Sequence, residues 1–156
     1  MKLNFKQLLP CIAIPLAVGA ISGIATSTSV TTWFVVLNKP SFNPPNYLFA
    51  PVWTTLYILM GVSFYIILQT PKHVWLQRAQ LIFGVQLILN FCWSFLFFKF
   101  HLVGVAFIEI LLIWLSIVTM IVVFTKINKT AALLQVPYLL WVSFASVLNG
   151  AIWFLN

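Results

Sequence analysis

The chain has 156 residues, of which 63% are hydrophobic and only 6% are charged, and its formal net charge is +7. A soluble domain carries about 25% charged residues, so this composition excludes an ordinary soluble domain and indicates a membrane protein. The basic residues are spread along the chain, whereas nucleic-acid binding would need them clustered on one face, so we expect no nucleic-acid partner.

The charged residues separate five long apolar segments. A helix needs roughly 20 apolar residues to cross a bilayer, and each segment is long enough. We predict spans near Leu8–Thr28, Leu48–Thr70, Leu76–Phe98, Leu102–Phe124 and Ala131–Leu155. The segments lack the alternation of apolar and polar residues that a β-barrel would need. The sequence therefore predicts an all-α membrane protein, a single domain over residues 1–156 built as a bundle of five transmembrane helices in the lipid bilayer.

The first span has two open questions. Lys2 and Lys6 precede its apolar run as in a secretory signal peptide, but the run is longer than a signal core and no small-residue cleavage site ends it. We therefore expect a retained helix. Within it, Gly19 and Gly23 have the spacing that lets two helices approach closely. This pair fits packing inside the bundle and a subunit interface equally well.

The segment between the first two spans is rich in proline and aromatic residues. Pro40, Pro44, Pro45 and Pro51 all lie within fifteen residues of sequence. Each proline fixes its own φ and biases the preceding residue toward extended geometry, so the loop should be stiff. We expect the loop over residues 37–47, with Pro44, to cover a binding cavity as a lid.

Three of the spans carry a face of aromatic and carboxamide side chains at helical spacing. The faces comprise Phe49, Trp53, Tyr57, Met60 and Phe64; then Gln86, Asn90, Trp93 and Phe97; then Tyr138, Trp141, Ala145 and Asn149. Carboxamides lose hydrogen bonds in lipid, so these faces should turn inward.

Two interpretations of these faces compete. In the first, the carboxamides hydrogen-bond across helices and the aromatic rings fill the core. In the second, the faces line a cavity for a flat, largely apolar ligand, with Asn90 and Asn149 as its hydrogen-bond partners. The pattern alone favours the packed core, because aromatic core stripes are common.

The last two spans contain one unusual residue each. Glu109 is the only acid, and an intramembrane acid is a candidate functional residue. It has no evident basic partner, so we expect a neutral carboxyl bonded to Ser116 or to a backbone carbonyl. Pro137 lies inside the last span and predicts a kink.

The sequence has no nucleophile–base pair, phosphate-binding loop or metal-ligand spacing, so we expect no cofactor and no metal.

The basic residues also predict orientation. One side of a five-span bundle would hold Lys2, Lys6, Lys72, Arg78, Lys126 and Lys129. The other side would hold only Lys39 and Lys99. Cytoplasmic loops are enriched in basic residues, which predicts a cytoplasmic N-terminus.

Three ordered motifs resemble one known family. They read Lys39-Pro-Ser-Phe-Asn-Pro-Pro followed by Phe49-Ala-Pro-Val-Trp53; Asn90-Phe-Cys-Trp93-Ser-Phe-Leu-Phe97; and Pro137-Tyr138-Leu-Leu-Trp141-Val-Ser-Phe-Ala145-Ser-Val-Leu-Asn149. The resemblance that they mark extends over nearly the whole length of the chain. The chain resembles the translocator protein family, also called tryptophan-rich sensory proteins or peripheral-type benzodiazepine receptors.

The resemblance implies a five-helix bundle that commonly forms homodimers. It implies binding of a tetrapyrrole such as protoporphyrin, binding of isoquinoline carboxamide and benzodiazepine-type ligands, and light-dependent oxidative breakdown of porphyrin in bacterial members. Trp53 and Trp141 match tryptophans essential to that breakdown. Asn90, Trp93, Ala145 and Asn149 match pocket-lining positions, and the proline-rich loop matches the segment that covers the pocket.

Two further points follow from the resemblance. The stretch from 148 to 154 lacks the tyrosine and basic residue of the cholesterol-recognition pattern in animal members, which fits a bacterial protein of the cell membrane. A tetrapyrrole transporter or a membrane stress sensor are the alternative functions. A transporter would need two accessible states. A sensor would need a surface on which partner proteins dock, and loops this short offer little of it.

Overall fold

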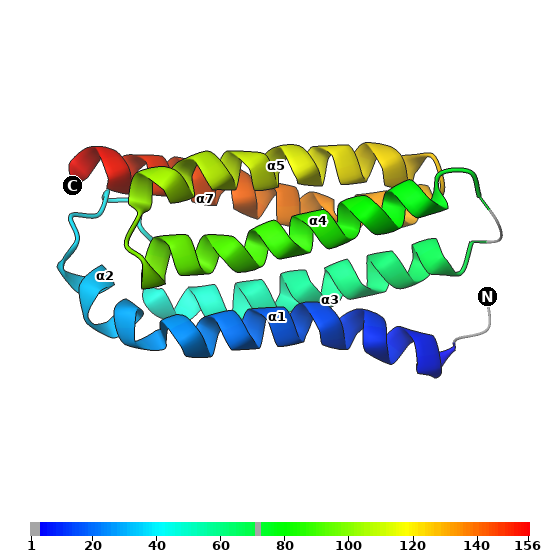
Figure 1. Ribbon diagram of the computed structural model, residues 1–156, viewed down its shortest axis with the longest axis horizontal. Coiled ribbons are helices and arrows are strands. Elements are labelled where there is room, and N and C mark those ends of the chain that lie inside the picture. Colours follow the sequence, from blue (N-terminus) through cyan, green and yellow to red (C-terminus); the bar gives the residue numbers. More distant parts are fainter. Residues whose placement is uncertain (1–3, 71–72) are drawn as a thin grey trace.

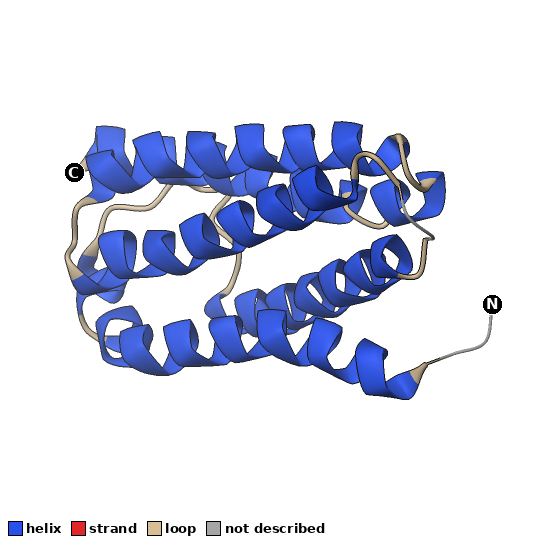
Figure 2. Cartoon of the chain, turned by 45° about the vertical axis from the view of Figure 1, so that its right-hand side comes forward, coloured by secondary structure: helices blue, strands red, loops and turns tan. Residues whose placement is uncertain are grey.

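The computed structural model describes residues 4–70 and 73–156, and this part of the chain is a bundle of helices (Figures 1 and 2). The long helices are α1 (Phe5–Thr31), α3 (Phe49–Leu68), α4 (Leu76–Ser94), α5 (Val103–Thr125) and α7 (Val136–Leu155). The short elements are α2 (Trp33–Val36), the 3₁₀ turn η1 (Asn46–Leu48), the π-helical turn η2 (Phe95–Lys99) and α6 (Lys129–Leu133).

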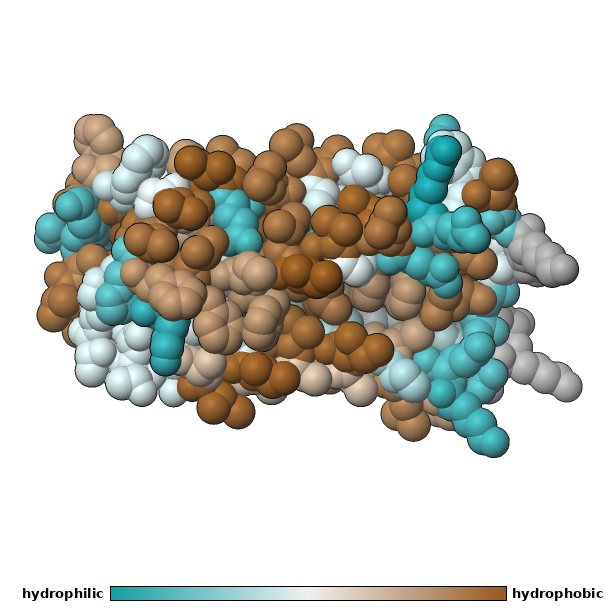
Figure 3. Space-filling model, viewed as in Figure 1, coloured by the Kyte–Doolittle hydropathy of each residue, from teal (hydrophilic) through white to brown (hydrophobic). Residues whose placement is uncertain are grey.

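Five stretches within the described residues are long and apolar enough to cross a membrane. They are Phe5–Thr31, Asn46–Leu68, Leu76–Lys99, Val103–Thr125 and Lys129–Leu155. Hydrophobic side chains dominate the middle of the molecule, and hydrophilic ones gather toward its two ends (Figure 3). This pattern matches a bundle with its middle in hydrocarbon and its loops in water. The predicted all-α fold with five spans is confirmed.

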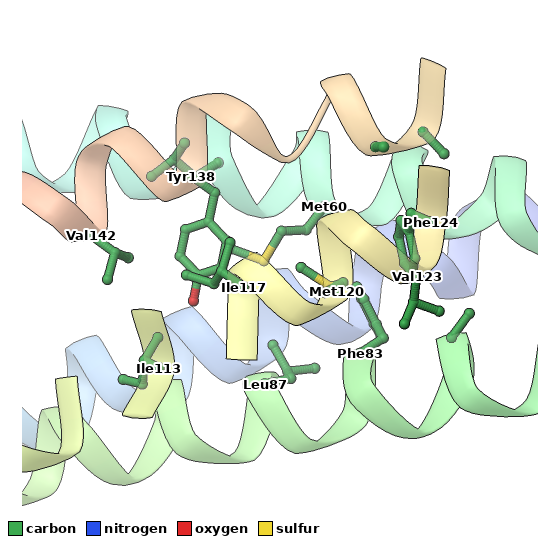
Figure 4. Packing of buried hydrophobic residues seen from close by; sticks show 14 of the residues in the cluster. Met60, Phe83, Leu87, Ile113, Ile117, Met120, Val123, Phe124, Tyr138 and Val142 are labelled. Atoms are coloured by element: carbon green, nitrogen blue, oxygen red, sulfur yellow. The ribbon is translucent and has the colours of Figure 1, made fainter. Parts of the chain in front are cut away.

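The helices pack antiparallel to their neighbours in sequence, with α3 beside α1, α5 beside α4 and α7 beside α5 (Figure 1). Met60 of α3 and Ile117, Met120 and Phe124 of α5 are fully buried at the centre (Figure 4). Because lipid tails are as apolar as these side chains, close packing and hydrogen bonds hold such a bundle together.

Two glycines allow α1 and α3 to lie close together. A Cβ added at Gly61 would lie 2.6 Å from the carbonyl oxygen of Cys11 and from Cα of Ile12, so only glycine fits there. A Cβ added at Gly19 would meet the ring of Tyr57. Of the two interpretations for the glycine pair in α1, the geometry of Gly19 therefore supports packing inside the bundle.

The last span is interrupted rather than merely kinked. α6 ends at Leu133 and α7 begins at Val136, so Pro137 lies in the first turn of α7. A missing N–H costs nothing in a first turn, because that N–H would lack a partner within the helix anyway. The proline thus marks the start of a new helix. Gln135, in the break, is fully buried.

Candidate ligand-binding site

A chain of side-chain hydrogen bonds joins α3, α4 and α7. The hydroxyl of Tyr57 donates to Oδ1 of Asn90 at 2.7 Å, and Nδ2 of Asn90 donates to the hydroxyl of Tyr138 at 3.1 Å. All three side chains are buried. Their bonds fix the rotation of three helices about their axes, and therefore the direction in which each aromatic face points.

A second hydrogen-bond chain joins α4, α7 and the start of α5. Nε1 of Trp93 donates to Oδ1 of Asn149 at 3.1 Å, and Nδ2 of Asn149 donates to the carbonyl of Val103 at 3.1 Å. The sequence leaves two roles open for Asn90 and Asn149, namely bonds across helices and bonds to a ligand. Both amides are bonded within the protein, as the cross-helix interpretation of the carboxamides predicts.

Beside this network lies a cavity of about 730 Å³. Its walls come from α1, α3, the end of α4 with η2, and α7, while α2 and η1 contribute at one end. Ligand sites for small molecules usually measure about 300–1,000 Å³ and are mostly apolar with a few polar groups. The cavity has this size and character, so the aromatic faces line a cavity as well as bonding across helices, and Tyr57, Trp93 and Asn149 take part in both.

Most of the predicted ligand-binding residues line this cavity. They are Phe49, Trp53, Tyr57, Trp93, Phe97, Trp141, Ala145 and Asn149. Pro44, Asn90 and Tyr138 are not among the lining residues. Asn90 instead accepts a hydrogen bond from the cavity-lining Tyr57, and Tyr138 accepts one from Asn90. Contact of any of these residues with a ligand stays a prediction.

The aromatic wall is built from rings that support one another. Trp53 stacks on Tyr57 with 5.5 Å between ring centroids and 29° between planes. Trp93 stacks on Phe97 at 5.2 Å and 22°. Such pairs contribute about 0.5–1.5 kcal/mol beyond the area they bury. The indole faces are therefore held in place without a ligand.

The wall that sequence reasoning missed comes from α1. Its lining residues are Leu16, Gly19, Ala20, Ser22, Gly23, Thr26, Ser27, Val30 and Thr31. A Cβ added at Gly23 would meet nothing within 4 Å, because this glycine faces open space. The recurrence of hydroxyl residues in a membrane helix was the available signal, since polar side chains in such helices usually face the bundle interior.

The proline-rich segment is tied down at its start. Nζ of Lys39 donates to the carbonyls of Phe34, Val35 and Leu37 at 2.8, 3.0 and 3.0 Å, which caps the end of α2. Asn38 and Asn156 exchange two hydrogen bonds of 3.0 Å, from the backbone N–H of Asn38 and from Nδ2 of Asn156. The loop is thereby fastened to the end of α7.

Glu109 does not have the partner expected for it. The hydroxyl of Ser116 donates to the carbonyl of Ile113 at 2.7 Å, within α5 itself. Oε2 of Glu109 is buried without a hydrogen-bond partner among the described residues. Glu109 is not among the cavity-lining residues. The predicted bond to Ser116 is therefore wrong.

Comparison with known proteins agrees with this architecture. The model of the TspO/MBR family matches residues 11–154. The chain belongs to the TspO/MBR family. A relative named tryptophan-rich protein TspO, from Chlorobaculum tepidum, is 41% identical over 155 residues, covering 97% of this chain and 98% of that protein.

Other family members are more distant. Protein CrtK of Rhodobacter capsulatus is 37% identical, covering 80% of this chain and 78% of that protein. The translocator protein of Homo sapiens is 33% identical, covering 78% of this chain and 73% of that protein. Family membership and the five candidate spans together establish a multi-pass membrane protein in a lipid bilayer.

The hydrogen-bond chain through Asn90 makes a testable prediction about stability. Asn90→Leu should leave the hydroxyls of Tyr57 and Tyr138 without their partner and cost about 1–3 kcal/mol for each orphaned group. Tyr57→Phe removes one hydroxyl and should cost less. Thermal unfolding in detergent measures both. An Asn90→Leu variant as stable as the unchanged protein would show that this network does not hold the helices together.

Proposed function

We propose that this protein binds a tetrapyrrole such as protoporphyrin in the aromatic cavity and promotes its light-dependent oxidative degradation. The observation that carries the proposal is the cavity of about 730 Å³ with Trp53, Trp93 and Trp141 in its walls. A flat macrocycle presents two π faces, and indole rings stack well on such surfaces. The same cavity would accept isoquinoline carboxamide and benzodiazepine-type ligands, which are also flat and largely apolar.

In this proposal the ligand is the chromophore, and the protein supplies position and oxidisable side chains. Light excites the macrocycle, and Trp53 or Trp141 donates one electron to it and releases its indole N–H proton. The reduced macrocycle passes this electron to dioxygen, which becomes superoxide. The indolyl radical takes one hydrogen atom from the macrocycle and is restored, and the macrocycle radical combines with superoxide and the released proton to give a hydroperoxide. Both oxygen atoms of dioxygen enter this product, and the macrocycle opens when its O–O bond breaks. Trp141 suits this role because it lines the cavity and packs edge-on against Phe49, with ring centroids 6.0 Å apart.

The surroundings of the site extend the proposal. The loop over residues 37–47 acts as a lid, supported by its fastening through Lys39 and Asn38 and by the edge-on packing of Phe42 against Phe144. The protein lies in the cell membrane with its N-terminus on the cytoplasmic side, and it forms a homodimer as the family resemblance implies. The proposed orientation rests on the distribution of basic residues, because cytoplasmic loops are enriched in them.

Filling the cavity tests where the ligand binds. Gly23→Leu places a branched side chain into open space in the cavity wall, so it should weaken protoporphyrin binding at least tenfold without a clash in the free protein. Gly84→Leu is the matched control, because Gly84 also has open space around an added Cβ but does not line the cavity. Quenching of tryptophan fluorescence measures binding. Equal affinity in the two variants would place the ligand elsewhere.

Replacing the two candidate redox tryptophans tests the degradation step. Trp53→Phe combined with Trp141→Phe should slow the bleaching of bound protoporphyrin under illumination at least tenfold. Trp114→Phe is the control, because Trp114 bonds Ser143 and does not line the cavity. Bleaching as fast as in the unchanged protein would exclude the two indoles as electron donors. Movement of porphyrin into sealed vesicles in the dark would instead favour transport.

A further inference from the structure

The cavity is open on one side. All of its exposed lining residues belong to two neighbouring segments of the chain. They are Ala20, Gly23, Ser27 and Thr31 of α1, and Asn46, Ala50 and Thr54 of η1 and α3. The lining residues of α2, α4, η2 and α7 are buried or half-buried. A closed cavity would expose its walls alike, so the opening lies between α1 and α3, which run side by side (Figure 1).

The packing of α1 against α3 loosens along their length. A Cβ added at Gly61 would lie 2.6 Å from backbone atoms of α1, and one added at Gly19 would meet the ring of Tyr57. One turn further along α1, a Cβ added at Gly23 would meet nothing within 4 Å. The two helices are therefore in close contact at one end and leave open space beside Gly23. We call this opening the α1–α3 slot, framed by Ala20, Gly23, Ser27, Ala50 and Thr54.

The slot lies at the depth of the hydrocarbon. Gly23 precedes the end of its span at Thr31 by about two helical turns, and Thr54 follows the start of its span at Asn46 by a similar length. The framing side chains are no larger than threonine. The hydroxyls of Ser27 and Thr54 donate to carbonyls of their own helices at 2.9 and 2.8 Å, so they do not hold water in the slot. Lipid chains therefore meet the slot.

The route from water, past the proline-rich loop, is fastened instead. Asn38 exchanges two hydrogen bonds of 3.0 Å with Asn156 at the end of α7. Phe42 packs edge-on against Phe144, with ring centroids 6.4 Å apart. A ligand entering by this route must break these contacts first, whereas the space beside Gly23 is already open.

We propose that the ligand enters and leaves the cavity sideways, from the hydrocarbon of the bilayer through the α1–α3 slot. This inference rests on the proposed tetrapyrrole binding and specifies its route, together with the ligand it favours, a flat apolar molecule dissolved in lipid. A macrocycle is thin, so it passes edge-on between two helices. The proline-rich loop then covers the cavity without having to open. Ala20 and Ala50 determine which ligands pass, because their small side chains leave the slot wide.

Narrowing the slot tests the route. Ala20→Leu combined with Ala50→Leu places branched side chains on both sides of it. In phosphatidylcholine vesicles, association and release of protoporphyrin dimethyl ester should both slow about tenfold while Kd stays within about threefold. A narrower passage raises the barrier between two end states that do not change. Stopped-flow tryptophan quenching measures association, and mixing with empty vesicles measures release. The saturable part of the quenching reports bound ligand.

Two further variants complete the experiment. Ala13→Leu combined with Ala17→Leu is the matched control, because both alanines are exposed on α1 and neither lines the cavity. Asn156→Ala tests the other route, because it removes the two bonds that fasten the loop to α7. Both rates should stay within about twofold of those of the unchanged protein in each variant.

The outcomes separate this inference from the proposed function. Unchanged rates after Ala20→Leu with Ala50→Leu would overturn the inference, and so would faster association after Asn156→Ala. Weaker binding with faster release in the leucine variant would also overturn it, because the leucines would then act on the bound state and not on the passage. Absence of saturable quenching in the unchanged protein would overturn the proposed function itself.

Discussion

The buried carboxamides of Asn90 and Asn149 find their hydrogen-bond partners within the protein, and this constraint organises the bundle. Water is absent from hydrocarbon, so Asn90 and Asn149 can be buried only because tyrosine, tryptophan and backbone groups satisfy them. Their bonds run between helices, and each one fixes how a helix is rotated about its axis. The aromatic faces of α3, α4 and α7 point where they do because Asn90 of α4 bonds tyrosines of α3 and α7, and Asn149 of α7 bonds a tryptophan of α4.

The cavity follows from what α1 contributes opposite those faces. Gly19 brings α1 against the ring of Tyr57, and Gly61 brings α3 against the backbone of α1. Around Gly23 and the neighbouring hydroxyl residues, by contrast, α1 has no bulky side chains to fill the space. One wall is therefore aromatic and the other is small and hydroxylic. In the proposed tetrapyrrole site, a flat ligand would stack on the first wall and lie against the second.

Much of this arrangement could be predicted from the sequence, and the reasons for the failures are physical. Helical periodicity placed Trp53, Trp93 and Trp141 on inward faces, because amphipathic spacing is a local property of the chain. The partners of Asn90 and Asn149 depend on the register between helices, which no local pattern encodes, so the sequence could predict cross-helix bonds but could not name the residues that make them. Likewise, the hydroxyls of α1 resemble any small-residue packing face until the opposing wall is known. The sequence predicted a kink at Pro137, whereas the structure has a break between two helices just before it. Pro137 fits the first turn of a helix as well as a kink, so the sequence could not decide between the two.

The central claim is that a macrocycle lies between the aromatic wall and α1. Anomalous diffraction from crystals of the protein with the zinc complex of protoporphyrin dimethyl ester tests this directly, because the metal marks the centre of the ring. The account predicts a single zinc peak inside the cavity, between Trp53 and Trp141 on one side and α1 on the other. A zinc peak on the lipid-facing surface of the bundle, with the cavity unchanged, would contradict it.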